Sequence, residues 1–182
     1  MICQYRQQHL KKDFKMDIFD APKNCIRTNS GLYINVFEPK SEMINIEDIA
    51  HALASLPRFG GHLNKHYSVA QHCVRCCEMA EGFEDKKAAL LHDASEAYML
   101  DIPTPIKSML PDYKKYEGNL MMFIANHFDF EYPLNEKVHT IDRDMLVYEW
   151  ENLVVNESEE FECWDHATAK SRFIDEFNNL FK

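Results

Sequence analysis

The segment ALLHDASEAYMLDIPTPIK, residues 89–107, places an imidazole and two carboxylates in the most apolar part of an expected helix. His92 and Asp93 follow directly on an alanine and two leucines. Glu96 lies three to four positions later, which is one helical turn, so it shares their side of the helix. A carboxylate buried alone costs free energy unless it is paired or binds a metal. The segment therefore predicts a functional site within the core.

Two further expected helices also carry a polar side chain at an apolar position. His72 lies among valine and cysteine residues, and Asp142 interrupts a stripe of valine, isoleucine, methionine and leucine. Single residues of this kind are usually structural, but the adjacent pair His92-Asp93 favours a shared site. Two imidazoles and two carboxylates suit a divalent transition metal, with coordination positions left for water and substrate.

The composition limits the class of protein and its partners. The chain has 182 residues, 46% of them hydrophobic and 27% charged, and a net charge of −10. This length allows one domain with a substantial core. The negative charge argues against a duplex nucleic acid as partner, because phosphate binding needs a basic surface. No apolar run approaches the roughly 18 residues of a membrane span, so we expect no membrane partner.

The cysteines and the N-terminal segment indicate a reducing compartment. MICQYRQQHLKKDFK has no apolar core of the kind found in signal peptides. Three of the six cysteines cluster on one expected helix, where neighbouring side chains diverge and disulfides are awkward. Among them, Cys73 and Cys76 have the spacing of zinc ligands, but without a second pair we interpret them as core or surface thiols. We expect reduced thiols in a cytoplasm.

We expect an all-α fold, a bundle of about six helices with a small β element near the N-terminus. Residues 31–39 alternate enough for a short strand, which could form a hairpin with the residues that follow it. Asn45 and Ser68 are expected to begin helices, and Pro57 and Gly82 to end them. The expected helices span residues 45–56, 67–82, 84–99, 112–128, 134–154 and about 164–181.

The candidate ligands together resemble those of the HD-domain metal-dependent phosphohydrolases, a family named for its His-Asp pair. HDASEAYMLDIPTPIK, residues 92–107, is similar to a segment of bacterial 5′-deoxynucleotidases, in which HDxSE is followed by D-(I/L)-P-x-P-x-K. INIEDIAHALASLPRFGGHLNKHYSVAQHC, residues 44–73, is similar to phage and prophage HD proteins of the YfdR type, which carry an RF-x-GH loop before YSVAQH. The resemblance spans about residues 30–150. It implies an HD helical bundle over residues 29–182, with residues 1–28 as an extension whose first 15 or so are expected to be mobile.

The resemblance implies a metal centre and two catalytic carboxylates. The implied metal ligands are His72, His92, Asp93 and Asp142. Glu96 matches the carboxylate that positions or deprotonates the attacking water. Asp101 matches an acidic residue close to the sugar and the reacting phosphate.

Four further residues match positions that contact substrate in the family. Arg58 matches a phosphate-binding arginine, and Lys107 matches a lysine that contacts the phosphate chain in phage triphosphohydrolases. Phe59 stands where relatives often have an aromatic residue beside the base or sugar. His62 belongs to the RF-x-GH pattern and could face the substrate.

The resemblance implies hydrolysis of a nucleotide 5′-phosphate with one divalent transition metal, which could be Mn, Fe, Co, Ni or Zn. We expect a 5′-deoxynucleotidase, which converts a dNMP to deoxynucleoside and phosphate. The alternatives are a dNTP triphosphohydrolase, similar to phage enzymes that hydrolyse dATP, and a nucleotide-sensing or host-modulating module without turnover. Because the four ligands and Glu96 are all present, we favour an enzyme.

Some features of the expected protein stay open at this point. His127 and His139 could serve a second metal, and Mg²⁺ is a further alternative, although the spacing favours one transition metal. Relatives assemble as dimers or larger rings, so we expect a homo-oligomer. We expect a bacterial cytoplasm, or that of a bacterial host cell if a phage encodes the chain.

Overall fold

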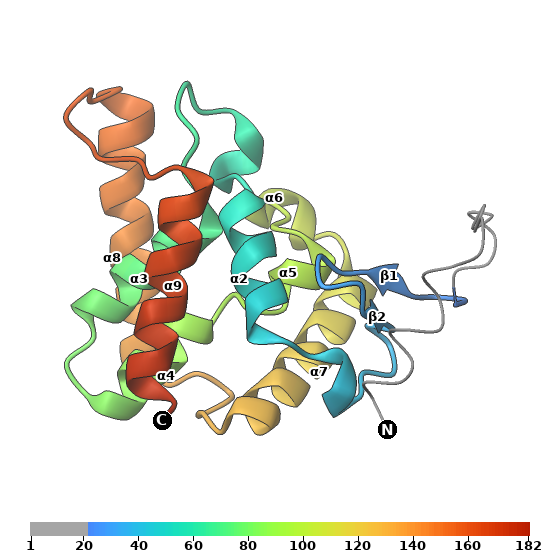
Figure 1. Ribbon diagram of the computed structural model, residues 1–182. Coiled ribbons are helices and arrows are strands. Elements are labelled where there is room, and N and C mark those ends of the chain that lie inside the picture. Colours follow the sequence, from blue (N-terminus) through green and yellow to red (C-terminus); the bar gives the residue numbers. More distant parts are fainter. Residues whose placement is uncertain (1–21) are drawn as a thin grey trace, which may run out of the picture.

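The computed structural model describes residues 22–182, and most of this part of the chain is helical (Figure 1). The expected all-α fold with a small β element is confirmed. Within residues 22–182 the longer helices number six, close to the expected number; they are α2 (Ile46–Ser55), α3 (Val69–Met79), α4 (Phe83–Leu91), α7 (Pro111–Phe128), α8 (Glu136–Glu149) and α9 (His166–Leu180). Among the described helices, none combines the length and the apolar character that crossing a membrane requires. The mobility expected for the first 15 residues concerns a segment outside the described range.

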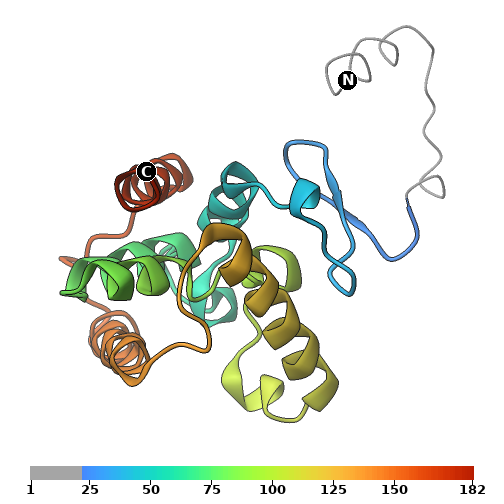
Figure 2. The same ribbon diagram turned by 90° about the horizontal axis from the view of Figure 1, so that it is seen from below.

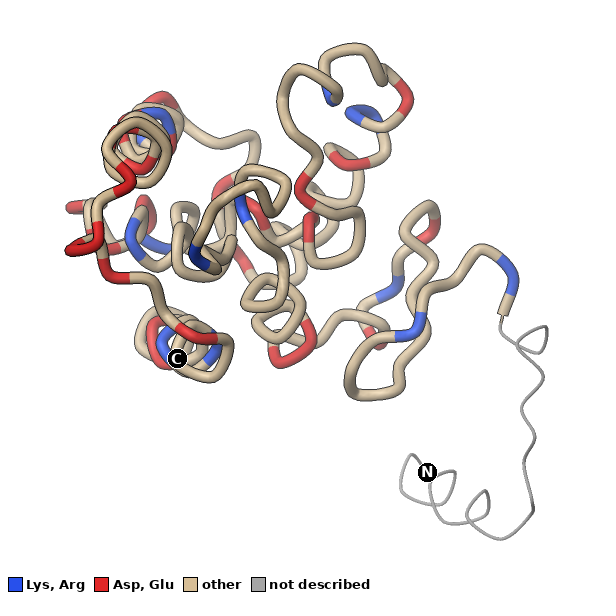
Figure 3. Tube along the Cα trace, turned by 90° about the horizontal axis from the view of Figure 1, so that it is seen from above, with Lys and Arg blue, Asp and Glu red and all other residues tan. Residues whose placement is uncertain are grey.

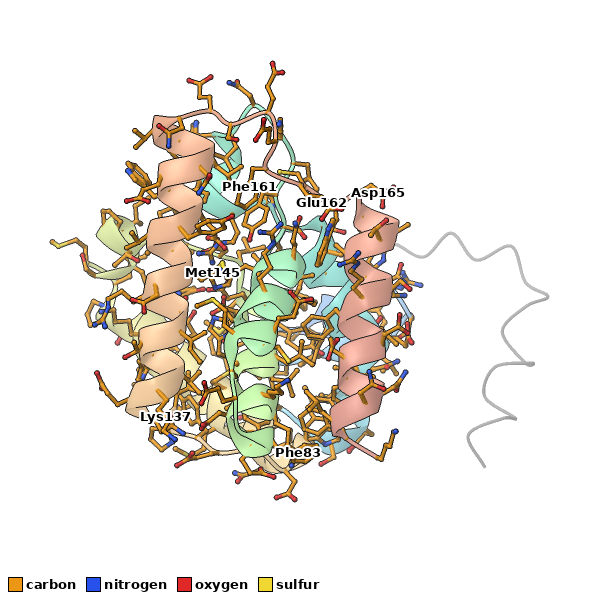
Figure 4. The ribbon with its side chains drawn as sticks, turned by 90° about the vertical axis from the view of Figure 1, so that its left-hand side faces the viewer. Phe83, Lys137, Met145, Phe161, Glu162 and Asp165 are labelled. Atoms are coloured by element: carbon orange, nitrogen blue, oxygen red, sulfur yellow. The ribbon has the colours of Figure 1, made fainter. Side chains whose placement is uncertain are left out.

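Helix α3 lies at the centre of the bundle. It contacts α2, α4, α8 and α9, while α9 also packs on α2 and α4. Figure 4 shows α8 and α9 on opposite sides of the pair formed by α3 and α4. Ile49, Leu53, Leu90 and Phe173 from these helices and Ile124 from α7 are fully buried in one hydrophobic cluster. The elements that carry His72, His92 and Asp142 are therefore held together by the main hydrophobic core.

The helix starts follow the sequence expectations, whereas one helix end does not. Asn45 caps α2 by accepting a hydrogen bond from the Glu47 amide at 3.0 Å. Ser68 caps α3 by accepting one from the Gln71 amide at 3.2 Å. Helix α3 ends at Met79, because the next residue has an extended backbone, and Gly82 is the N-cap of α4. The prediction that Gly82 closes α3 was wrong.

The helix expected over residues 84–99 is divided by a turn. Helix α4 ends at Leu91, and a single helical turn, α5 (Glu96–Met99), follows residues 92–95. The Ala94 amide bonds to the Leu91 carbonyl at 3.0 Å, three residues back. Such bonds tighten the backbone relative to an α-helix. A second short helix, α6 (Thr104–Lys107), begins within the Pro-x-Pro segment.

The β element is a hairpin formed with the residues that precede the expected strand. Strands β1 (Ile26–Arg27) and β2 (Tyr33–Ile34) are antiparallel, with Ile26 opposite Ile34. The intervening turn contains Gly31, whose φ of +90° favours glycine. After β2, the Asn35 side chain accepts a hydrogen bond from the Phe37 amide at 3.1 Å, which turns the chain away from the sheet. The expected pairing with following residues was therefore wrong, and β1 lies inside the segment 1–28.

Asp48 joins the hairpin to the helical bundle, whose edge the hairpin occupies (Figure 2). Its carboxylate accepts hydrogen bonds from the Ser30 amide at 2.7 Å and the Ser30 hydroxyl at 2.6 Å. Asp48 lies in the first turn of α2 and is only 3% exposed. Hydrogen bonds to a buried charged acceptor are among the stronger ones in proteins.

We expect Asp48→Ala to lower the free energy of unfolding by about 1–3 kcal/mol, because both Ser30 donors lose their acceptor. Urea unfolding followed by circular dichroism measures the change. The exposed Glu42 provides a matched control, and Glu42→Ala should change the free energy by less than about 0.5 kcal/mol. Equal stabilities of the two variants would contradict a structural role for Asp48.

Candidate metal centre

The four residues predicted to bind a metal converge from three elements of the bundle. His72 comes from α3, Asp142 from α8, and His92 and Asp93 from the turn after α4. The Nε2 atoms of His72 and His92 are 3.3 Å apart. Asp142 Oδ1 lies 3.1 Å from Nε2 of His72 and 3.6 Å from Nε2 of His92. Asp93 Oδ2 lies 3.2 Å from Nε2 of His92 and 4.0 Å from Nε2 of His72.

Three of these five separations, those of 3.1–3.3 Å, fit donors that share one metal ion, whereas those of 3.6 and 4.0 Å are wider. With bonds of about 2.1 Å, ligand atoms at tetrahedral or octahedral angles lie about 3.0–3.4 Å apart. Both imidazoles are buried, whereas the Asp142 side chain is 43% exposed. The cluster could therefore hold a metal that is anchored in the core and accessible from one side.

Hydrogen bonds at the far side of each imidazole set its orientation. Nδ1 of His92 donates to the Ala89 carbonyl at 2.7 Å, because a carbonyl oxygen can only accept. Nδ1 of His72 lies 2.6 Å from Oε1 of the Glu149 carboxylate, which likewise accepts. Both rings thereby turn Nε2 toward the cluster, which is how histidines are commonly held in metal sites.

Glu149 connects this cluster to a neighbouring cation. Its carboxylate is fully buried and also accepts a hydrogen bond from the Tyr67 hydroxyl at 2.7 Å. Arg58 Nη2 lies 3.1 Å from Glu149 Oε2, and Arg58 Nη1 lies 3.8 Å from Asp93 Oδ2. Burial alone would raise the pKa of Glu149, but His72 and Arg58 lower it. One charged carboxylate thus orients an imidazole and a guanidinium together.

Cys76 belongs to the same cluster, but its sulfur lies against the His72 ring and is not in line with the lone pair of the His72 Nε2 atom. Its Sγ lies 3.5 Å from Nε2 of His72 and 4.0 Å from Nδ1 of the same ring. A sulfur in line with the Nε2 lone pair would lie much farther from Nδ1 than from Nε2. The thiol therefore packs against the imidazole, and the two imidazoles with Asp93 and Asp142 are the better ligand set.

Glu96 is a buried carboxyl group beside the cluster. Its Oε1 lies 3.4 Å from Lys107 Nζ, while its Oε2 is buried without a hydrogen-bond partner. Burial, followed by the charges of Asp93 and Asp101, raises the pKa of Glu96 to about 9. Lys107 is held more closely by Glu117, at 2.8 Å. Glu96 is therefore placed where it can take up or hold a proton.

A large cavity gives access to the cluster. It has a volume of about 1020 Å³, and both Asp93 and Asp142 line it, while His72 and His92 lie behind them. The residues predicted to contact substrate or to act in catalysis also line it; they are Arg58, Phe59, His62, Glu96, Asp101 and Lys107. The structure thus brings all ten predicted site residues to one place, and their individual roles stay predictions. Within residues 22–182, the clusters suited to a metal include neither His127 nor His139.

Comparison with known proteins places the chain in a family. It is 39% identical over 128 residues to Uncharacterized protein YfdR of Escherichia coli (strain K12), an alignment covering 70% of this chain and 71% of that protein. The chain belongs to the YfdR family. An uncharacterized protein of Rhodobacter capsulatus is 37% identical to this YfdR-family chain over 92 residues, which cover 46% of the chain and 47% of that protein. No family model matches the chain.

Sequence reasoning missed Glu149, although the sequence of this YfdR-family chain contains a signal for it. Glu149 follows Asp142 by seven positions, two turns of α8, so both project from the same side of the helix. Met145, between them, is buried. A glutamate at a buried position two turns from a candidate metal ligand predicts a residue that orients the ligands.

We expect Glu149→Gln to weaken transition-metal binding by about 10- to 100-fold, since residues that orient ligands have effects of this size. The amide loses the charge that attracts the His72 ring and the Arg58 guanidinium. Competition with a chromophoric chelator measures the affinity for Co²⁺ or Zn²⁺. Asp144→Asn, an exposed site on the same helix, is the control, and equal affinities of the two variants would contradict the role of Glu149.

We expect Glu96→Gln to stabilise the metal-free protein by about 1–3 kcal/mol at pH 7. The pKa of Glu96 is raised on folding, so the unfolded chain loses this proton first as the pH increases from about 4.5. The contribution of Glu96 to the free energy of unfolding is therefore most favourable below about pH 4.5, and it decreases as the pH rises to about 9. Urea unfolding with EDTA at pH 5 and pH 8 should show a larger gain from the substitution at pH 8. A gain that does not increase with pH would refute the raised pKa.

Proposed function

We propose that this chain is an HD-type metal-dependent phosphohydrolase that cleaves the 5′-phosphate of a deoxynucleotide. The observation that carries the proposal is the shared cavity. Asp93 and Asp142 line it together with Glu96, Arg58 and Lys107, and the imidazoles of His72 and His92 lie within 3.6 Å of Asp142. Imidazole and carboxylate donors suit Mn, Fe, Co, Ni or Zn.

The side chains around the cluster have different roles in the proposed hydrolysis of a phosphoester. A divalent metal bound there supplies Lewis-acid activation of water and of a phosphoryl oxygen. Glu96 orients the attacking water and, in its ionised form, accepts the water's proton. A divalent cation held by the cluster would favour that form, because it would offset the charge of Asp93 that raises the pKa of Glu96. Arg58 and Lys107 neutralise charge that develops on the phosphoryl oxygens.

Asp101 supplies the proton that the leaving group needs. Burial, followed by the charge of Asp93, raises the pKa of Asp101 despite opposing cations. The water oxygen forms a bond to phosphorus, the bond from phosphorus to the 5′-oxygen breaks, and the 5′-oxygen takes up a proton. The products are a deoxynucleoside and inorganic phosphate.

The charges lining the cavity favour a monophosphate over a triphosphate. Six acidic side chains line it, namely Asp93, Glu96, Asp101, Asp142, Glu151 and Glu157, against the two basic ones, Arg58 and Lys107. Both cations already have carboxylate partners, Glu149 and Glu117. Acidic residues are also distributed over most of the described helices and loops (Figure 3). A triphosphate would face more repulsion here than a monophosphate.

Hydrolysis assays with Mn²⁺ or Co²⁺ on panels of dNMPs, dNTPs and NTPs test the proposal. We expect inorganic phosphate from dNMPs, and a loss of at least about 100-fold in kcat/KM in Asp93→Ala, together with lower metal content. The exposed Asp112 provides the control, and Asp112→Ala should retain both activity and metal.

The products separate the alternatives. Triphosphate released from dNTPs would identify a triphosphohydrolase of the same class. Metal and nucleotide binding without turnover would identify a sensing or partner-binding module and refute the enzymatic proposal. Asp93→Ala with unchanged metal content and hydrolysis would refute the metal centre.

A further inference from the structure

An aromatic corner lies on the cavity wall, formed by residues far apart in the sequence. The rings of Phe59 and Trp150 have centroids 6.0 Å apart and planes inclined at 49°. Both residues line the cavity that contains the metal cluster. Trp150 is 51% exposed, so its ring leaves a large apolar surface in contact with solvent. Core packing does not explain an aromatic side chain in this position.

Trp150 is aligned with the metal cluster along α8. Asp142, Leu146 and Trp150 follow one another at intervals of four residues, and all three line the cavity. Eight residues correspond to about 12 Å along a helix axis. This span suits a molecule with a phosphate at one end, a flat apolar group at the other and a sugar between them.

The backbone on both sides of the corner is irregular. Phe59 has a left-handed backbone, with φ of 56° and ψ of 30°, a conformation that is uncommon for a bulky residue. Trp150 begins η4 (Trp150–Val155), a π-helical segment in which the Asn156 amide bonds to the Glu151 carbonyl at 3.0 Å. Strained residues and π-helical turns occur preferentially at functional sites. Here both features position the aromatic rings of one wall.

We propose that Trp150, together with Phe59, forms the surface on which the nucleotide base stacks, an inference that rests on the proposed function. A ring inserted between two parallel aromatic planes needs about 7 Å between them, twice a contact of about 3.5 Å. The rings of Phe59 and Trp150 are closer than this and inclined, so the base packs into their corner against the exposed face of Trp150. Stacking of this kind tolerates different bases, because every base has an aromatic face.

The test separates base recognition from hydrolysis by using two fragments of a substrate. Deoxyadenosine carries the base without the phosphate, and deoxyribose 5-phosphate carries the phosphate without the base. Equilibrium dialysis measures deoxyadenosine binding, and steady-state assays compare kcat/KM for dAMP and deoxyribose 5-phosphate. The metal-loaded full chain is used throughout.

We expect Trp150→Leu to weaken deoxyadenosine binding by at least about 10-fold. The same variant should reduce the preference for dAMP over deoxyribose 5-phosphate by a similar factor. Trp150→Phe keeps an aromatic face and should remain within about 3-fold of the wild type. Tyr148, which is 48% exposed on the same helix and does not line the cavity, provides the matched control Tyr148→Leu, which should bind like the wild type.

The other outcomes decide separately on the aromatic site and on the proposed reaction. Unchanged deoxyadenosine binding in Trp150→Leu overturns the aromatic site, whether or not the protein hydrolyses nucleotides. Equal kcat/KM for dAMP and deoxyribose 5-phosphate in the wild type also overturns it and leaves the phosphohydrolase proposal standing. Binding that depends on Trp150 without hydrolysis of any nucleotide supports the aromatic site and refutes the proposed reaction.

Discussion

The arrangement of the site depends on one buried carboxylate, that of Glu149. It accepts hydrogen bonds from His72 and Tyr67 and pairs with Arg58, so it determines how an imidazole of the cluster and a cation of the cavity are oriented. A charge buried at this depth is stable only with such partners. Residues from α3, from α8 and from the loop between α2 and α3 are thereby held in one relative position.

The sequence predicted the features that follow from local patterns. Hydrophobic periodicity and the caps Asn45 and Ser68 located the helix starts, and polar residues at apolar positions identified His72 and Asp142. The predicted helix starts are confirmed. The structure also brings His72 and Asp142 to 3.1 Å from each other, with His72 fully buried and the Asp142 side chain 43% exposed, and their role as metal ligands stays a prediction. The distances among the four predicted ligands then followed from the packing of α3, α4 and α8.

The features that depend on tertiary contacts were not predicted. The break between α4 and α5 leaves the helical pattern of residues 84–99 intact and is visible only in the hydrogen bonds. The pairing of β2 with preceding residues depends on the turn around Gly31. The corner of Phe59 and Trp150 joins residues about ninety positions apart, and no local signal relates them.

The π-helical segment η4 has a consequence for how this site can vary. Asp142 lies within the regular part of α8, whereas Trp150 stands where the wider turns begin. A π-helical turn accommodates an additional residue in a helix, so insertions or deletions after Trp150 can be absorbed downstream without displacing Asp142. Asp142 and Trp150 thus lie on either side of this change in helical geometry. Substitutions and insertions could therefore reshape the part of the cavity around Trp150 while the position of Asp142 is retained.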